Sequence, residues 1–173
     1  FILINGLLIL YSYYYGYSSH PEIVNKLWLG FSPLSIKIFT ASILLSSIAF
    51  AYLYYYLGKN SIRTKQLWQW YIAFSLIFVA SMLWMETAIQ ALITKKKYLF
   101  YLVSTLLFIV STGSFYLLWL VNQEFSNKKL TLIVSLFVFH VYVMDNIIWN
   151  YRWISTYILP KKYAKTWNLL NVY

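Results

Sequence analysis

The chain of 173 residues contains no cysteine. Disulfide bonds, thiolate nucleophiles, zinc–thiolate sites and iron–sulfur clusters are therefore excluded within this chain. Histidine is also scarce, with only His20 and His140. A bis-histidine haem would need both on facing helices at one depth, which their positions do not support. No Glu-x-x-His spacing is present, which disfavours an iron or copper site built from Glu86, Asp145 and His140.

Charged residues are equally scarce, at 10% of the sequence, whereas a soluble domain usually carries about 25%. Hydrophobic residues make up 61% and occur in long, almost uncharged runs. A run of about 20 apolar residues is what an α-helix needs to cross the hydrocarbon core of a bilayer. The composition therefore excludes a soluble core and predicts an integral, multi-pass membrane protein.

The apolar runs are predicted to be helices, because only helices and closed barrels satisfy backbone hydrogen bonds in lipid. Barrel strands alternate apolar and polar residues over about 10 residues, and these longer runs do not alternate. We expect an all-α membrane protein, an antiparallel bundle of about five transmembrane helices in a single domain, residues 1–173. The predicted helices cover about residues 1–17, 36–57, 67–93, 98–121 and 130–151, followed by a tail at 152–173.

The longest connection, residues 18–35, contains the signals of a further short helix. Pro21 suits the first position of a helix, and Glu22 places an acid in its first turn. Gly30 can end the segment. The apolar residues between them fall on one side of a helix, which predicts a short interfacial helix: Ile23, Val24, Leu27 and Trp28.

Small residues predict where the helices touch, because lipid tails provide no hydrophobic force between helices. Ser42 and Ser46 lie four residues apart and share a face of the second run. Ser111 and Gly113 lie near the middle of the fourth run, where the glycine permits close approach of a neighbouring helix.

Only two acidic residues, Glu86 and Asp145, lie inside the apolar runs. A charge in the bilayer costs at least ~2.5–3.5 kcal/mol, so each acid implies a partner or a function. At 100° per residue, Glu86 falls on a stripe that is half polar and is therefore expected to face protein rather than lipid. The stripe consists of Ser75, Val79, Met82, Glu86, Gln90 and Ile93.

The polar residues near Asp145 give two rows on an α-helix. Asp145 and Arg152 differ by about 20° around the axis, with Trp149 beside them, whereas His140 is expected about 140° away from Asp145. The second row is formed by Asn146 and Asn150.

Three interpretations of these residues remain open. In the first, Asp145 pairs with Arg152, and Glu86 is protonated or bonded to Gln90 or to another subunit. In the second, Glu86 and Asp145, with His140, form a proton or cation site. In the third, the two acids line a ligand pocket together with Trp84 and Trp149.

The basic residues lie in short connections and in the tail, and the net charge is +10. In a multi-pass protein such residues contact lipid headgroups and set orientation, so we expect no nucleic-acid partner. The clusters expected at the headgroups are Lys95, Lys96 and Lys97, and Lys161 and Lys162.

The choice of residue types is characteristic of an AT-rich genome, such as that of an organelle or a large DNA virus. Phe, Tyr, Met, Ile, Asn and Lys together number 73, whereas Gly, Ala, Arg and Pro number 18. No catalytic or cofactor motif is present. We therefore expect no enzyme but an accessory subunit of a larger membrane complex, such as a respiratory assembly of the mitochondrial inner membrane. Its partners would be other membrane subunits and bound lipids, with no cofactor; the alternative is a small transporter, channel or ligand-binding membrane protein.

Overall fold

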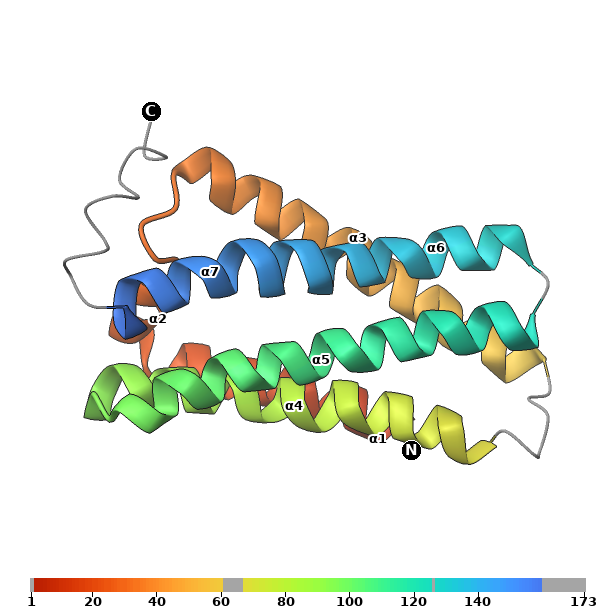
Figure 1. Ribbon diagram of the computed structural model, residues 1–173, viewed down its shortest axis with the longest axis horizontal. Helices are drawn as coiled ribbons and strands as arrows, with labels where there is room; N and C mark the ends of the chain where they lie inside the picture. Colours follow the sequence, from red (N-terminus) through yellow and green to blue (C-terminus); the bar gives the residue numbers. More distant parts are fainter. Residues whose placement is uncertain (1, 61–66, 126, 160–173) are drawn as a thin grey trace.

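The computed structural model describes residues 2–60, 67–125 and 127–159. Of these residues 92% are helical and none lies in a strand, so the predicted all-α class is confirmed. Long helices form a bundle with a short helix at one end (Figure 1). The elements in chain order are α1 (Ile2–Ser19), α2 (Pro21–Leu27), α3 (Pro33–Lys59), α4 (Leu67–Thr94), α5 (Lys97–Glu124), α6 (Lys128–Phe139), the π-helix η2 (His140–Trp149), α7 (Asn150–Trp153) and the π-helix η3 (Ile154–Ile158).

Within the described residues, four helices are long and apolar enough to cross a membrane. They are α3, α4, α5 and the continuous helix Lys128–Ile158, which joins α6, η2, α7 and η3. Their bounds lie close to the predicted ones, except that the last helix continues past residue 151 to Ile158. Most of the predicted tail, residues 160–173, lies outside the described residues. The first predicted segment is helical as α1, but α1 is not among the four candidate spans.

Side-chain caps fix where two of the long helices begin. Ser32 Oγ accepts a hydrogen bond from the backbone amide of Ser35 at 3.1 Å, and Pro33 takes the first helical position. Asn127 Oδ1 accepts hydrogen bonds from the second and third amides of α6, at 3.1 and 3.2 Å. These contacts satisfy amides that have no partner within the helix itself.

The α4–α5 connection turns through a residue in the left-handed conformation. Lys95 has φ of 57°, which costs an L-residue about 1–2 kcal/mol. Helices often end with a residue in this conformation, which is usually glycine. The tight turn lets α5 return antiparallel beside α4 (Figure 1).

Replacing Lys95 with glycine should therefore stabilise the protein by about 1 kcal/mol, because glycine adopts this conformation without strain. The measurement is the midpoint of thermal unfolding in mild detergent. Lys96→Gly is the matched control, since Lys96 has an ordinary extended backbone with φ −74° and ψ 120°. An equal response of the two variants would contradict this account of the turn.

Gly113 brings α5 close to α4, as its position in the sequence predicted. A methyl group in place of its hydrogen would lie 2.9 Å from Leu76 Cβ and 3.2 Å from the carbonyl oxygen of Ala73. The carbonyl oxygen belongs to the α4 backbone and the Cβ atom is bonded to it, so neither atom can move without moving the helix. The contact between the two helices therefore requires glycine at this position.

We expect Gly113→Ala to destabilise the protein by about 1–3 kcal/mol, the usual cost of overpacking a tight contact. Thermal unfolding in detergent measures the loss. Gly58→Ala is the control, because a methyl group at Gly58 meets nothing within 4 Å. If both variants were equally stable, the close approach at Gly113 would not contribute to stability.

The helices pack around two apolar clusters. α1 lies against α4, and α3 lies against α6, with α3 running obliquely across the last helix (Figure 1). One cluster is built around Phe74 and Phe78. The other contains Phe100, Trp149 and Trp153.

The short helix α2 begins at Pro21, as predicted. Its apolar side chains Ile23 and Leu27 are buried in the second cluster. Trp149 Nε1 donates a 2.9 Å hydrogen bond to the carbonyl oxygen of Leu27. α2 is thus docked onto the bundle through its apolar face.

Candidate functional site

The last long helix changes its hydrogen-bond pattern where its polar residues lie. From His140 to Trp149 it is a π-helix, in which backbone hydrogen bonds join residues five apart instead of four. Residues five apart therefore lie on closer faces of the helix than they would in an α-helix. π-Helical segments are rare and occur frequently at functional sites.

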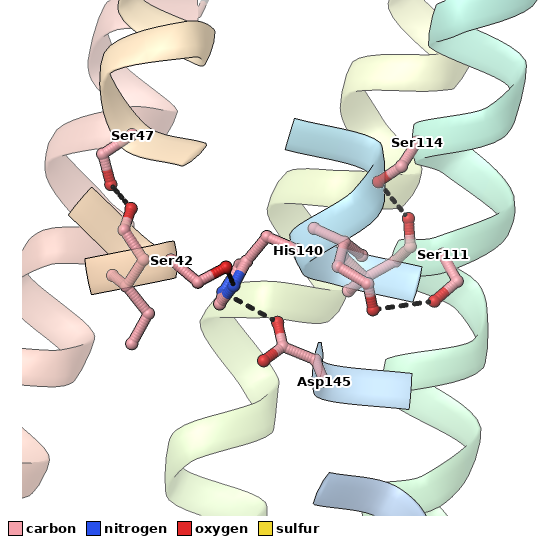
Figure 2. Close-up of polar contacts among 9 residues, drawn as sticks. Ser42, Ser47, Ser111, Ser114, His140 and Asp145 are labelled. Carbon is pink, nitrogen blue, oxygen red and sulfur yellow. Dashed lines mark hydrogen bonds and ion pairs between the residues drawn. The ribbon is translucent and has the colours of Figure 1, made fainter. Parts of the chain in front are cut away.

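This winding brings His140 and Asp145 together. His140 Nε2 lies 3.4 Å from Asp145 Oδ2 (Figure 2). The prediction that His140 lies about 140° from Asp145 is wrong, because it assumed α-helical geometry throughout. A step of five residues overshoots one turn of an α-helix by 140° but overshoots the wider turn of a π-helix by much less, so the two side chains come onto neighbouring faces.

The other nitrogen of the imidazole reaches across to α3. His140 Nδ1 lies 2.9 Å from Ser42 Oγ, so Ser42, His140 and Asp145 form a continuous polar row (Figure 2). The His140 side chain is 8% exposed and that of Asp145 is 30% exposed. The sequence indicated Ser42 only as a small residue at a helix contact, and its hydrogen bond to histidine was missed.

The residue types in this row are those of a hydrolase triad, but the arrangement differs from one. The serine contacts Nδ1 and the carboxylate contacts Nε2, which reverses the usual roles of the two nitrogens. Hydrolases of this type commonly aim backbone N–H groups at the reacting oxygen. Ser42 lies within the long helix α3, where such groups bond along the helix. The row is better suited to holding a polar group than to acyl transfer.

A second serine fastens η2 to α5. Ser111 Oγ donates a long hydrogen bond, 3.4 Å, to the carbonyl oxygen of Val141 (Figure 2). Ser111 is 3% exposed. The serines predicted at helix contacts thus hold the π-helix from two sides, Ser42 from α3 and Ser111 from α5.

Asp145 and His140 line a cavity of about 570 Å³ between α1, α3, α4 and the last helix. Most of the wall is apolar and aromatic. Among the residues that the structure describes, Asp145 is the only acid in the lining, and none of them in the lining is a lysine or arginine. The volume falls within the roughly 300–1,000 Å³ that is typical of small-molecule sites.

An aromatic wall stands beside the carboxylate. Tyr13 of α1 stacks on Trp84 of α4 with 5.9 Å between ring centroids, and Trp84 meets Trp149 edge to face at 5.1 Å. All three residues line the cavity. Tyr13 also lies near enough to Asp145 to interact with its charge. The wall joins α1, α4 and η2.

Glu86 lies elsewhere, on the outward face of α4. It is exposed, and its Oε1 accepts a 2.9 Å hydrogen bond from Gln90 Nε2. Two other members of its stripe, Val79 and Ile93, are 49% and 46% exposed. The prediction that this stripe faces protein is therefore wrong within the described chain. The buried side of α4 is formed by small and apolar residues, such as Ala73, because these allow closer helix packing.

The remaining polar residues of the last helix bind within the chain. The pairing of Asp145 with Arg152 is not observed in the described structure. Arg152 instead donates to the carbonyl oxygen of Leu29 at 3.4 Å, and its guanidinium lies 4.4 Å from the centroid of the Phe31 ring. The predicted second row is present, since Asn150 Nδ2 donates to Asn146 Oδ1 at 3.1 Å.

The lysines assigned to lipid headgroups fall into two groups. Lys95, Lys96 and Lys97 are exposed at the α4–α5 connection. Lys161 and Lys162 lie outside the described residues. In the part of the chain that the structure describes, no three residues among His, Asp and Glu form a cluster suited to a metal ion. Glu86 does not join His140 and Asp145, and it does not line their cavity.

The indole of Trp149 is expected to hold α2 in place. Trp149→Phe keeps an aromatic ring but removes the hydrogen bond to Leu27, at a cost of about 1 kcal/mol. Amides of residues 21–27 should then exchange with deuterium about fivefold faster, because α2 opens more often. Trp119→Phe is the control, since Trp119 is 47% exposed. Unchanged exchange in Trp149→Phe would contradict this role.

Comparisons with protein-family models, with curated proteins and with solved structures give no match for this chain. The described chain has two polar sites that bear on its function. One site is the outward acid Glu86 with Gln90. The other is the inward row of Ser42, His140 and Asp145 at the cavity.

Proposed function

We propose that this chain is a non-catalytic, structural subunit of a larger membrane complex. The observation that carries the proposal is the outward position of Glu86 on a helix long enough to cross the membrane. Its one hydrogen bond within the described chain comes from Gln90. A carboxyl group on the outside of such a helix faces lipid unless another protein covers it.

The depth of Glu86 supports this proposal. α4 has 28 residues and is therefore ~42 Å long, whereas the hydrocarbon core is about 30 Å thick. Glu86 lies roughly 8 Å from the midpoint of the helix at ~1.5 Å per residue. With α4 centred in the bilayer, this carboxyl group is inside the hydrocarbon core, where a charge costs at least ~2.5–3.5 kcal/mol.

A neighbouring subunit removes this cost if it brings a basic or hydrogen-bond-donating side chain to the same depth. The surface around Glu86 is suited to contact with such a helix. Val79, Leu83 and Ile93 are 49%, 52% and 46% exposed, and all are apolar. The partner would therefore be another membrane-spanning subunit.

The proposal includes α1 as a fifth transmembrane helix. Its 18 residues extend over ~27 Å, and it packs along α4, where Gly16 meets Met85. In this arrangement α2 lies in the membrane interface, with Glu22 and Lys26 exposed and its apolar face on the bundle. The α4–α5 connection lies at the same end of the molecule as α2 (Figure 1), and its residues Lys95, Lys96 and Lys97 would meet lipid headgroups there.

The more specific form of the proposal is a respiratory-type complex of the mitochondrial inner membrane. It is supported by composition alone, through the excess of residues with AT-rich codons. Sequencing the gene tests this part separately, because a GC-rich nuclear gene with ordinary codons would overturn the organellar origin.

A second candidate function is a small proton or cation transporter, channel or ligand-binding protein. The contact between His140 and Asp145 at the cavity favours it, since a half-buried acid beside an imidazole is suited to binding a proton or a cation. Glu86 takes no part in this candidate, because it faces outward. The two candidates therefore depend on different acids.

Native-gel electrophoresis with mass spectrometry, after mild detergent extraction from the source membrane, tests the subunit proposal. We expect the chain to migrate with a large complex. Glu86→Gln should reduce the share that migrates with the complex, because the glutamine cannot form the same ion pair. Asp145→Asn, which alters the inward site, should leave that share unchanged.

Migration of the wild-type chain as a monomer or small homo-oligomer would overturn the subunit proposal. Flux in proteoliposomes then tests the second candidate. That candidate requires pH-dependent flux that Asp145→Asn abolishes and Glu86→Gln preserves. An undiminished complex in Glu86→Gln would show that this carboxyl group is not at the subunit interface.

A further inference from the structure

The cavity beside η2 has a lipid-like interior with a single acidic group in its wall. Its lining is mainly aliphatic and aromatic, and Asp145 is the one acid among the described lining residues. Apart from His140 and Tyr13, the described structure gives this carboxylate no interacting side chain. No lysine or arginine of the described ranges lines the cavity, and Arg152 contacts Leu29 and Phe31 instead.

We propose that this cavity binds a hydrophobic amine, with its ammonium group at Asp145 and its hydrocarbon chain along α1 and α3. This site is distinct from the outward face at Glu86, so the inference does not depend on the subunit proposal. It applies equally if the chain is a transporter.

The chemistry around Asp145 favours a cationic head over other heads. An anionic head would be disfavoured beside an acid, and a neutral head could not form a charge-assisted hydrogen bond with it, whereas an ammonium group can. Alkyl ammonium groups have pKa values near that of lysine, about 10.4, so they are charged at neutral pH. The rings of Tyr13, Trp84 and Trp149 add aromatic faces, which attract cations electrostatically.

The shape of the cavity favours a long apolar body over a bare inorganic cation. Lining residues on α1 run from Gly6 to Tyr17, a distance of roughly 16 Å along the helix. Ser46 is the buried polar residue of α3 in the lining, and the residues around it are mainly apolar. A small hydrated cation would leave most of this space unfilled.

The cavity opens towards the outer apolar surface between α1 and α3. Leu7 and Leu10 of α1 and Ile43 and Tyr54 of α3 line it. The same four side chains are 59%, 67%, 42% and 43% exposed. A ligand dissolved in the bilayer therefore reaches the cavity from the side, without crossing water.

A photoreactive long-chain primary amine, with the alcohol of the same chain as its neutral counterpart, tests the proposal. Both are applied to the full chain in phosphatidylcholine vesicles, and the labelled peptides are identified by mass spectrometry. We expect saturable labelling of lining peptides by the amine, competed by unlabelled amine. The alcohol should label without saturation.

Asp145→Asn should raise the half-saturating amine concentration about tenfold, because it replaces a charge-assisted contact by a neutral one. Glu86→Gln is the matched control and should bind as the wild type does. Equal labelling by the amine and the alcohol, or unchanged saturation in Asp145→Asn, would overturn the proposal.

A second variant keeps the test decisive if Asp145→Asn does not fold. Gly6 lines the cavity, and a side chain at this position meets nothing within 4 Å. Gly6→Phe should therefore fill the space and abolish saturable labelling. Gly58→Phe, also in open space but outside the lining, should label normally. Normal labelling of Gly6→Phe would place the amine elsewhere and overturn the assignment of the cavity.

Discussion

The architecture depends on one constraint, which is that backbone amides and carbonyls inside a bilayer must find partners within the protein. Long helices meet it through their own hydrogen bonds, and the described chain is accordingly almost all helix. η2 meets the same constraint with a different spacing, in which each bond spans five residues. That change of spacing is what places His140 over Asp145. The row of Ser42, His140 and Asp145 thus depends on the hydrogen-bond pattern of the backbone in η2.

The sequence predicted the helices well because apolar run length is a strong signal in membrane proteins. The positions of α3, α4 and α5, the start of α2 at Pro21 and the close contact at Gly113 followed from residue types and spacing. These features depend on local chemistry, such as capping and small size, which a single sequence displays directly. The number of transmembrane helices was harder to predict, because α1 has the 18 residues needed but its second half is rich in tyrosine and serine, which makes it less apolar than the four candidate spans.

The candidate site was predicted less well, for two physical reasons. Angles around a helix were counted at 100° per residue, so the π-helix made the expected separation of His140 and Asp145 wrong. The stripe through Glu86 was also expected to face protein rather than lipid, whereas within the described chain Glu86 is exposed on α4 and bonds to Gln90. Counting angles identifies which residues share a face of a helix, but it does not identify what that face contacts. The side chain of Arg152 donates to the backbone carbonyl of Leu29, which is distant in the sequence. A local sequence pattern does not reveal such a contact.

The close contact at Gly113 has a mechanical consequence. α4 and α5 touch almost backbone to backbone, and packing of this density resists deformation. α1 and α3, which flank the cavity, rest on different helices, α4 and α6 respectively. We therefore expect α4 and α5 to move as one rigid unit, whereas α1 and α3 move independently of each other. Thermal motion of α1 and α3 would change the width of the lateral opening while α4 and α5 keep their relative position.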